Sequence, residues 1–356
     1  LTQIDRECGP GTGPMMLPSD ADGPTTWRQR QDLTLVRNPH HWRRLAEPGC
    51  WNIGGVRLLF RSGPSIFTAV LSGEIDWVMP ASVDAVLGQH PELAEHYRKL
   101  AYDYETLGVV GILWNCRVPA LQDVRVRRAL AMLLDREAIV AGFPDTAVPA
   151  VAFAKPGTPA YPPGPSDADG IEPLPFDPPA ARALLRDAGF DAAAGKPLAL
   201  HVLATPDGGI MDLAVDLLRD ACKQAGVELT VDTLTFAAYV AKKTSGDWDG
   251  ILMKRSFRPW GDPFDFVHSG GLDNDGDWQN AEADRLATAA RRELDEARRC
   301  ALWHELHALV YREQPFAFLV HPRACILFNK FVENAEPGPR GLWPERWWVA
   351  PEHQRR

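Results

Sequence analysis

The sequence predicts an α/β protein that folds as two lobes, and three observations support this prediction. The chain has 356 residues, which is too long for one small core and suits two domains of ordinary size. Hydrophobic residues make up 45% of it and charged residues 24%, as in folded globular proteins. Strand-like and helix-like segments alternate over residues 198–255, an order that builds a mostly parallel sheet with helices packed on it.

The first hundred residues predict a compact unit of mixed α and β structure. A short alternating strand at 33–35 ends at the turn signal Asn38-Pro39. The elements expected after it are a strand at 56–60, a helix at 66–71 and a strand at 75–78.

A single long helix is expected over residues 123–143. Asp123 is placed to cap its first turn. Its apolar stripe is formed by Val126, Leu130, Leu133 and Leu134.

The chain changes character over residues 144–179, where prolines and glycines are frequent and periodicity is weak. We expect this segment to lie as an extended loop over the surface. A flexible linker between domains is the alternative, and apolar anchors argue against it. The expected anchors are Val148, Val151, Phe153, Tyr161 and Phe176.

Regular structure is expected to resume with a helix at 177–189. Asp177 is an N-cap candidate, Pro178 takes the first helical position, and Gly189 is placed to end the helix in a left-handed conformation. The elements expected after it are strands at 198–204, 227–234, 248–255, 316–322 and 324–331, helices at 211–225 and 236–243, and two helices within 281–314.

Composition and termini exclude some classes of protein. The net charge of −9 argues against a phosphate backbone as main partner, so nucleic-acid binding is not expected. No run of 18 or more apolar residues is present, and the first residues lack the pattern of a signal peptide. The chain opens with Leu1, which suggests a fragment or a processed form. The six cysteines show no C-x-x-C spacing, which argues against a zinc ribbon or redox motif and leaves their pairing open.

No catalytic residue and no cofactor site is predicted. The hydrolase elbow G-x-S-x-G and the P-loop pattern are both absent. The glycines within residues 9–16 lack the spacing of a dinucleotide site and suggest a tight turn.

Three groups of residues are similar to metal sites, but none is predicted to be one. His304 and His307 share a helix face without a third ligand, so a solvated or capping pair is expected. His40 and His41 would point to opposite faces of a strand. The stretch "DNDGDW" departs from calcium-loop spacing, and an acidic surface turn is expected for Asp273, Asp275 and Asp277.

The stretch "RSFRPWGDPFDFVHSGG", residues 255–271, suits neither a helix nor a regular strand. It follows the last strand of the predicted β-α-β-α-β run. Because ligands of open α/β sheets bind at the carboxyl ends of the strands, this loop is the candidate ligand-binding segment.

The order of several blocks resembles a known family. The blocks are "GTGPMML", "LVRNPHHW", "IFTAVLSGEIDWV", "LWNCRVPALQDVRVRRALAMLLDREAIV", "FDPPAARALLRDAGF" and "WDGILMKRSFRPWGDPFDF". The chain resembles the extracytoplasmic solute-binding proteins of family 5, the peptide- and nickel-binding components of ABC importers. The likeness extends over residues 9–330 and is most specific in "DVRVRRAL" and "FDPPAARALLRDAGF".

The resemblance implies an α/β, two-lobed periplasmic-binding-protein-like fold (type II, cluster C) with mixed or parallel sheets flanked by helices. Residues 1–114 plus 322–356 would form the first lobe and residues 115–321 the second. Because family members are longer, the chain is expected to lack the N-terminal part of its first lobe.

The resemblance also implies a binding protein rather than an enzyme. As a monomer without a cofactor, it would capture a peptide-like solute or a small metal chelate between its lobes and deliver it to an ABC permease in the membrane. A periplasmic or extracytoplasmic location follows, with a lipid anchor on the missing N-terminal part as one form of it.

The loop at 255–271 corresponds to the cleft-facing segment of the second lobe in this family. Peptide-binding members often carry an aspartate there that holds the amino group of the peptide. Pro259 takes its place, which argues against ordinary peptide recognition. The wording R-x-W-G-x-P-[FY]-D instead resembles nickel-chelate-binding members, and the ligand-binding residues it implies are Arg258, Trp260, Gly261, Asp262, Phe264 and His268.

The chemistry of these side chains agrees with such a role. The rings of Trp260 and Phe264 offer a rigid wall for a planar or cationic ligand, and Arg258 suits a carboxylate. His268 can reach the open position of a metal chelate. The alternatives are that the two aromatic residues only anchor an irregular connection and that His268 is a solvated loop histidine.

Two other functions stay open at this point. One is the ligand-sensing domain of a transcriptional regulator whose DNA-binding part is missing from this chain. The other is a degenerate or truncated relative without a transport role. A signal or lipoprotein sequence ahead of the chain would favour transport, and a basic helical domain would favour regulation.

Overall fold

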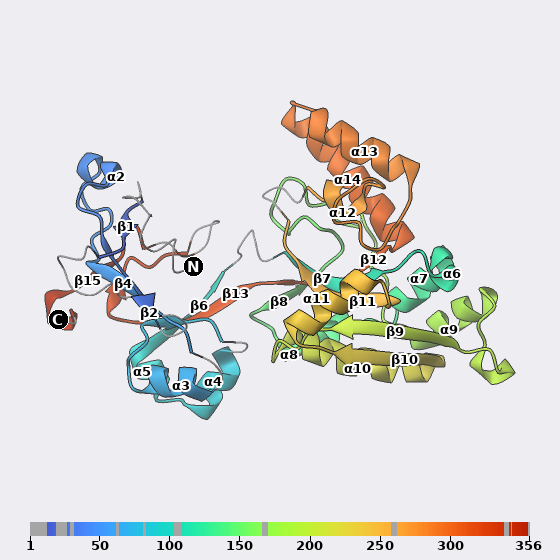
Figure 1. Ribbon diagram of the computed structural model, residues 1–356, viewed down its shortest axis with the longest axis horizontal. Coiled ribbons are helices and arrows are strands. Elements are labelled where there is room, and N and C mark those ends of the chain that lie inside the picture. Colours follow the sequence, from blue (N-terminus) through green and yellow to red (C-terminus); the bar gives the residue numbers. More distant parts are fainter. Residues whose placement is uncertain are drawn as a thin grey trace. The chain divides into compact units, whose positions relative to one another are not determined.

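The structure is a computed structural model. It describes residues 13–18, 27–28, 32–61, 64–80, 83–102, 108–165, 170–257, 262–337, 342 and 344–354. The chain divides into two compact units (Figure 1): unit 1 comprises residues 1–103 and 325–356, and unit 2 comprises residues 104–324. The lobe boundaries expected at 114/115 and 321/322 stay a prediction.

Unit 2 is built on one mixed sheet in the order β10-β9-β11-β7-β12-β8. β9 pairs in parallel with β10 and β11, which confirms the parallel arrangement expected over 198–255. β7 runs antiparallel to β11 and β12, and β8 runs antiparallel to β12. The strands are β7 (Val109–Trp114), β8 (Ala147–Pro149), β9 (Leu198–Ala204), β10 (Val227–Thr233), β11 (Gly250–Arg255) and β12 (Phe316–Pro322).

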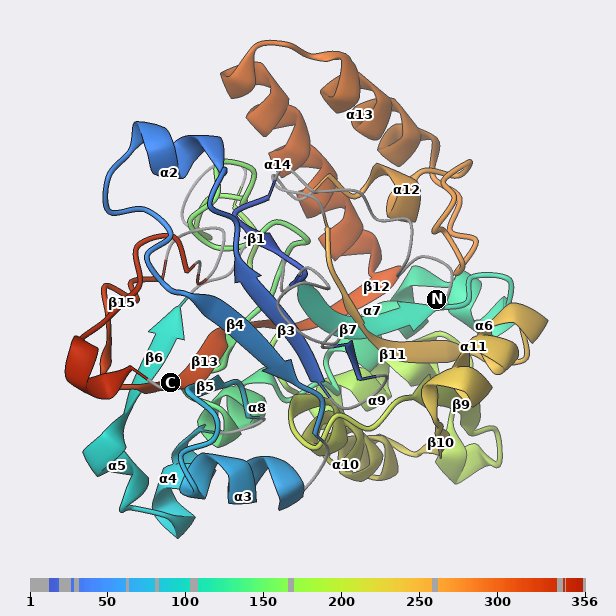
Figure 2. The same cartoon turned by 60° about the vertical axis from the view of Figure 1, so that its left-hand side comes forward.

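Helices cover both faces of this sheet (Figures 1 and 2). Leu252 of β11 packs into the core formed with α7, α8, α9 and α10, and its neighbours Ile251 and Met253 pack into the core formed with α13, α14 and residues 150–154. This alternation shows that the strand is buried on both faces. The helices of unit 2 are α6 (Pro119–Gln122), α7 (Val124–Ala131), α8 (Arg136–Gly142), α9 (Pro178–Asp187), α10 (Ile210–Ala225), α11 (Phe236–Ser245), α12 (Phe264–Val267), α13 (Ala281–Arg292), α14 (Glu296–Glu313) and the 3-10 turn η3 (Ala192–Ala194).

The capping signals of α9 act as expected. The carboxylate of Asp177 accepts a hydrogen bond from the amide of Ala180 at 2.9 Å, and Pro178 is the first helical residue. Gly189 follows the helix with φ +96, a conformation that favours glycine. The predicted helix at 177–189 is therefore confirmed at both ends.

The single helix expected over 123–143 is wrong. Asp123 does cap α7, accepting from the amide of Arg125 at 2.8 Å, but this helix ends at Ala131. Asp135 then accepts from the amide of Ala138 at 2.8 Å and begins α8. A second N-cap inside the apolar stripe thus divides the segment into two helices.

The segment 144–179 is only partly the surface loop that was expected. Residues 147–149 form the edge strand β8, and residues 150–155 are buried. Phe153 is 2% exposed and lies 4.8 Å, centroid to centroid, from both Phe257 and Phe318. Phe176, also expected to be an anchor, is 42% exposed. The segment enters the core because the ring of Phe153 packs against Phe316 and Phe318 of β12 and against His307 of α14.

The paired histidines of α14 differ from expectation. The His304 ring lies 3.0 Å from the carbonyl oxygen of Pro159, but His307 is fully buried, so a solvated or capping pair is wrong for His307. Burial lowers the pKa of His307 to about 3. Neither ring nitrogen has a hydrogen-bond partner among the described residues. The backbone of Ala160 opposes the lowering of the pKa, but burial has the larger effect.

Unit 1 contains small sheets and short helices, and its strands at 32–37 and 55–59 and its helix at 64–71 confirm the expected elements. The hydroxyl of Tyr97 donates to the carbonyl oxygen of Ile75 at 2.6 Å and joins the strand β6 to the turn after α3. The elements are β1 (Met15–Met16), β2 (Trp27–Arg28), β3 (Asp32–Arg37), β4 (Gly55–Leu59), β5 (Trp77–Val78), β6 (Tyr97–Tyr102), β13 (Ala324–Asn329), β14 (Val332–Glu333), β15 (Trp348–Val349), α2 (Trp42–Ala46), α3 (Pro64–Leu71), α4 (Val83–Gln89), α5 (Leu93–His96) and η4 (Pro351–His353).

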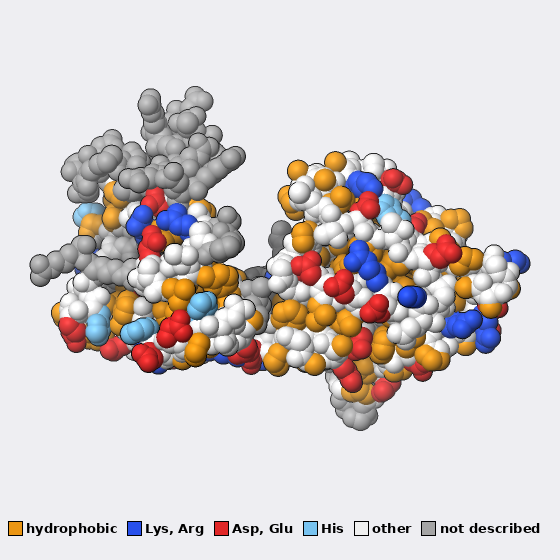
Figure 3. All heavy atoms as spheres, turned by 90° about the horizontal axis from the view of Figure 1, so that it is seen from below, with side chains coloured by type: hydrophobic (Ala, Val, Ile, Leu, Met, Phe, Trp, Pro, Cys, Tyr) orange, Lys and Arg blue, Asp and Glu red, His pale blue; other side chains and the backbone are white. Residues whose placement is uncertain are grey.

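The described helices include none that is long and apolar enough to cross a membrane. On the face of unit 2 that Figure 3 shows, acidic and basic side chains are interspersed.

The two phenylalanines of the 144–179 segment form a matched test. Phe153→Ala should lower the free energy of unfolding by about 3–5 kcal/mol, because it leaves a cavity in a packed aromatic cluster. Phe176→Ala should change it by less than about 0.5 kcal/mol, because that ring is exposed. Denaturant unfolding measures both, and equal losses would contradict the described core.

His307 should make stability depend on pH. Its pKa in the folded chain is about 3, below its ordinary value of 6.5, so the unfolded chain binds more protons between these values. The free energy of unfolding should therefore decrease as the pH falls from 6.5 toward 3, by at most about 1.4 kcal/mol per pH unit from this group. His307→Leu should flatten the curve, and His40→Gln, which alters an exposed histidine, should leave it unchanged. Parallel curves for His307→Leu and the parent chain would refute this assignment.

Candidate ligand-binding site

The carboxyl ends of three parallel strands form one edge of the unit 2 sheet. β9 and β10 end side by side at Ala204 and Thr233, and β11 runs three residues further at the same edge, to Arg255. Side chains from three different loops therefore converge at this edge. The candidate loop begins there, because it follows Arg255 directly.

Half of the predicted ligand-binding residues belong to the described part of this loop. Arg258, Trp260 and Gly261 lie outside the described residues, as does Pro259. The other three lie in or beside α12, a single helical turn at Phe264–Val267. Phe264 is its first residue, Asp262 precedes it and His268 follows it. The loop expected to be wholly irregular thus contains one turn of helix.

Arg291 of α13 brings two of these predicted residues together. Its guanidinium donates to the carboxylate of Asp262 at 2.8 Å and to that of Asp265 at 3.1 Å. It also lies over the ring of Phe264, 3.9 Å from the centroid. Desolvation opposes the charge of Arg291, but the two carboxylates outweigh it and raise its pKa. We call these residues the Arg291 clamp.

His268 completes the stack on Phe264. The two ring centroids are 4.4 Å apart and the planes differ by 22°. The Nδ1 atom of His268 accepts a hydrogen bond from the amide of Gly270 at 2.9 Å, and a carboxylate oxygen of Asp284 lies 4.0 Å from it. Only Nε2 is therefore available to a ligand, with Nδ1 already engaged by the backbone.

The ring of Phe264 is therefore in contact with two side chains of the protein itself, Arg291 and His268. This contact explains how a short turn without a side-chain N-cap bond is held on α13. It also supports the alternative in which Phe264 anchors the loop, and a ligand-lining role for this ring stays a prediction.

Ion pairs engage cations of α11 and β11. Lys243 of α11 lies 2.6 Å from Asp275, and Arg255 contacts Asp273. Asp277 instead accepts from the side-chain amide of Gln279 at 2.9 Å. The three aspartates of "DNDGDW" thus have separate partners and do not converge on one point.

In the described part of the chain, one group of potential metal ligands lies close together, in unit 1. It consists of Glu47, Cys50 and Glu345. Arg43 already holds both carboxylates, at 3.0 Å and 2.9 Å. Burial, with help from Glu47, raises the pKa of the Cys50 thiol, and the guanidinium of Arg43 supplies positive charge to the two carboxylates.

Two exposed side chains at the carboxyl edge were not among the ligand-binding residues predicted from the sequence. Phe236, the first residue of α11, is 75% exposed, and Lys254 near the end of β11 is exposed. An aromatic residue directly after a predicted strand and a lysine breaking the run "GILM" were the available signals. Neither signal distinguishes a binding residue from an ordinary surface residue, because the distinction depends on neighbouring loops.

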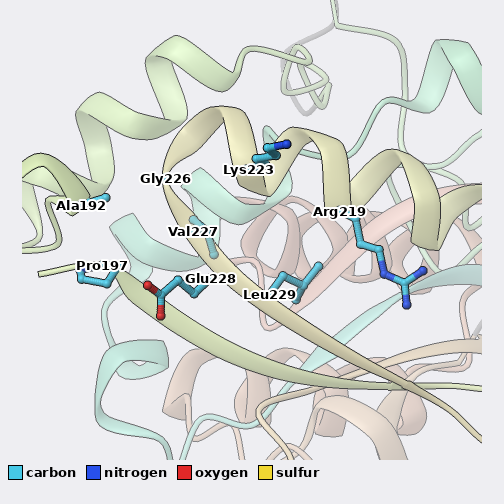
Figure 4. A pocket seen from close by; sticks show the side chains of 8 residues that line it. All are labelled: Ala192, Pro197, Arg219, Lys223, Gly226, Val227, Glu228 and Leu229. Carbon is cyan, nitrogen blue, oxygen red and sulfur yellow. The ribbon is translucent and has the colours of Figure 1, made fainter. Parts of the chain in front are cut away.

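A shallow hollow of about 320 Å³ lies elsewhere on unit 2, at the amino end of β10 (Figure 4). This hollow lies at the edge opposite the candidate loop, because the loop leaves the carboxyl end of β11. Ligands of such sheets usually bind at the carboxyl ends of the strands. Its lining residues are Ala192, Pro197, Arg219, Lys223, Gly226, Val227, Glu228 and Leu229.

Comparison with known proteins assigns the chain to a family. Residues 9–278 match the family described as "Bacterial extracellular solute-binding proteins, family 5 Middle". The chain belongs to this family. The match confirms the predicted family, which is a class of solute-binding proteins.

Relatives of this family member are about a quarter identical to it over the aligned residues. The oligopeptide-binding protein AppA of Bacillus subtilis is 26% identical over 260 residues, which cover 68% of this chain and 47% of the relative. The probable deoxycholate-binding periplasmic protein YgiS of Escherichia coli is 26% identical over 268 residues, covering 73% of this chain and 48% of the relative. The chain therefore spans about half the length of the curated relatives it matches.

Solved structures share the fold of this chain. AppA from Bacillus subtilis in complex with a nonapeptide has a TM-score of 0.75 at 20% identity, covering 95% of this chain and 66% of that one. NikA from Staphylococcus aureus in complex with Ni(L-His)2 has a TM-score of 0.74 at 18% identity, covering 96% and 69%. These likenesses confirm the predicted α/β, periplasmic-binding-protein-like fold of type II.

The Arg291 clamp can be tested by hydrogen exchange. Arg291→Met should accelerate exchange of the Phe266, Val267 and His268 amides by about fivefold, because a cation–π contact and two exposed ion pairs contribute about 1 kcal/mol together. These amides close the α12 turn by donating to Pro263 and Phe264.

Arg285→Met is the matched control, since Arg285 also lies on α13 but pairs with Glu282 of its own helix. It should leave those amides unchanged. Equal protection of α12 in both variants would show that Arg291 does not hold the loop.

Proposed function

We propose that this chain acts as the substrate-binding component of an ABC importer and captures a peptide-like solute or a small metal chelate between two lobes. The observation that carries the proposal is the family match over residues 9–278. The names of two related proteins support the two solute classes: one is an oligopeptide-binding protein and the other was solved with Ni(L-His)2.

The proposed mechanism is closure of the lobes on the solute. Hinged lobes move as rigid bodies, and a solute that contacts both of them shifts the equilibrium toward the closed form. In unit 2, the carboxyl edge of the sheet would supply one wall, with Trp260 and Phe236 as aromatic surfaces and Arg258 as a partner for anionic groups. Pro259 in place of an aspartate disfavours recognition of a peptide through its amino group.

The remaining parts of the proposal concern the setting of the protein. We place it as a monomer outside the cytoplasmic membrane, in the periplasm or an equivalent compartment, where it delivers solute to an ABC permease. A lipid anchor on a preceding segment is compatible with this placement. Neither catalysis nor nucleic-acid binding forms part of the proposed role.

A sensing domain of a transcriptional regulator is the other function that the sequence left open. The relatives named above are binding proteins, and the described structure contains no observation that favours regulation. The transport reading is therefore preferred.

A thermal-shift screen of the full chain tests the proposal. Tri-alanine, mixed dipeptides, opine-like compounds, and Ni²⁺ with L-histidine are the probes, and NiCl₂ alone and glucose are the controls. A true solute at about 100 times its Kd contributes about 2.7 kcal/mol, which should raise Tm by about 4 °C for a chain of this length.

Selective stabilisation by one probe class would support the proposal and define the class. A cooperative melt that no probe shifts would contradict solute binding. A broad, uncooperative melt would instead favour a degenerate relative without a transport role.

A further inference from the structure

Four basic side chains belong to α11 and to the end of β11, and three of them have acidic partners. Lys242 lies 2.5 Å from Asp232. The pairs of Lys243 and Arg255 with aspartates of "DNDGDW" are described above. Lys254 differs, because it makes no hydrogen bond or ion pair with any residue that the structure describes.

The position of Lys254 explains why it has no partner within the chain. It is the fifth residue of β11 and pairs with Val110 of β7. Strand alternation directs it to the same face of the sheet as Leu252, away from Arg255 and its aspartate. It is exposed at this edge.

Among the described residues, Asp207 is the acidic neighbour that acts on Lys254 electrostatically, and this carboxylate is already engaged. Asp207 accepts from the amide of Gly209 at 2.9 Å and from that of Met211 at 3.1 Å, where it caps the start of α10. Partial desolvation lowers the pKa of Lys254, and Asp207 offsets this only in part. The ammonium group is therefore exposed to solvent without an acidic partner among the described residues, and it can donate charge-assisted hydrogen bonds to an anionic group of a solute.

We propose that Lys254 binds a carboxylate of the captured solute and makes an acidic group a requirement for tight binding. This inference rests on the proposed function, because it assigns a specificity to the same site. Lys254 has no acidic partner among the described residues at the proposed ligand-binding edge, whereas the neighbouring Lys242 and Arg255 are paired with aspartates.

The loop sequence agrees with this polarity. The position expected to carry an aspartate for an amino group holds Pro259, so the loop lacks that negative charge. A site with an unpaired cation and without that anion should select the carboxylate end of its solute. Both solute classes meet this condition, since a peptide has a terminal carboxylate and so does a chelating amino acid.

Paired probes with and without the carboxylate test the inference. Calorimetry on the full chain would compare tri-alanine with tri-alanine amide, and Ni²⁺ with L-histidine against Ni²⁺ with L-histidinamide. For whichever pair binds, the carboxylate form should bind at least about tenfold more tightly, as expected for one charge-assisted hydrogen bond. Lys254→Met should remove this difference, and Lys254→Arg should keep most of it.

Lys242→Met is the matched control, since it removes a neighbouring lysine that is already paired, and it should keep the full difference. A parent chain that binds both forms of a probe equally, or a Lys254→Met variant that still discriminates, would overturn this inference and leave the proposed function standing. A parent chain that binds neither pair would overturn both.

Discussion

Burial of β7 on both faces is the constraint on which unit 2 depends. This strand, Val109–Trp114, pairs with β11 on one side and β12 on the other, and all six of its residues are buried. At Gly111 an added Cβ would lie 2.4 Å from the carbonyl oxygen of Ala317 and 2.5 Å from the ring of Phe316. Any larger residue would push β12 away from β7. Because the same strand supports β11, this close approach also positions the loop that leaves β11 toward the candidate site.

Buried arginines join distant parts of the chain to this core. Arg136 of α8 donates to the carbonyl oxygen of Phe318 at 2.8 Å, and Arg127 of α7 donates to that of Glu313 at 2.7 Å. Burial lowers the pKa of both guanidiniums, and main-chain carbonyl groups provide most of their hydrogen bonds. Removing one of these side chains would leave several carbonyl oxygens without a partner. These contacts connect residues more than 180 positions apart, because they join α7 to the last residue of α14 and α8 to β12.

The candidate site is organised by charges that the protein satisfies internally. The Arg291 clamp holds α12 on α13, and aspartates after the loop pair with Lys243 and Arg255. Such pairs arrange side chains but have little capacity left for a solute. Under the proposed function, recognition would depend on the groups that remain, namely exposed aromatic rings such as Phe236 and the ammonium of Lys254, which has no acidic partner among the described residues. Specificity at such an edge follows from which charges the fold leaves unbalanced.

The sequence by itself determined the local elements and the family. The Asp177 cap, the glycine at 189 and the alternating strands around α10 act over a few residues, so their signals are legible without tertiary structure. The order of the blocks likewise identified the solute-binding family, and the candidate loop was located correctly at the end of β11.

Tertiary structure alone decided burial and pairing. Phe153 and Phe176 occur in the same proline-rich segment, yet one is in the core and the other on the surface. His307 is buried because a segment about 150 residues earlier covers its helix, and Asp207, the acidic neighbour of Lys254 among the described residues, caps α10. Sequence spacing does not predict these outcomes, since each depends on which distant segment packs against a given surface and satisfies its polar groups.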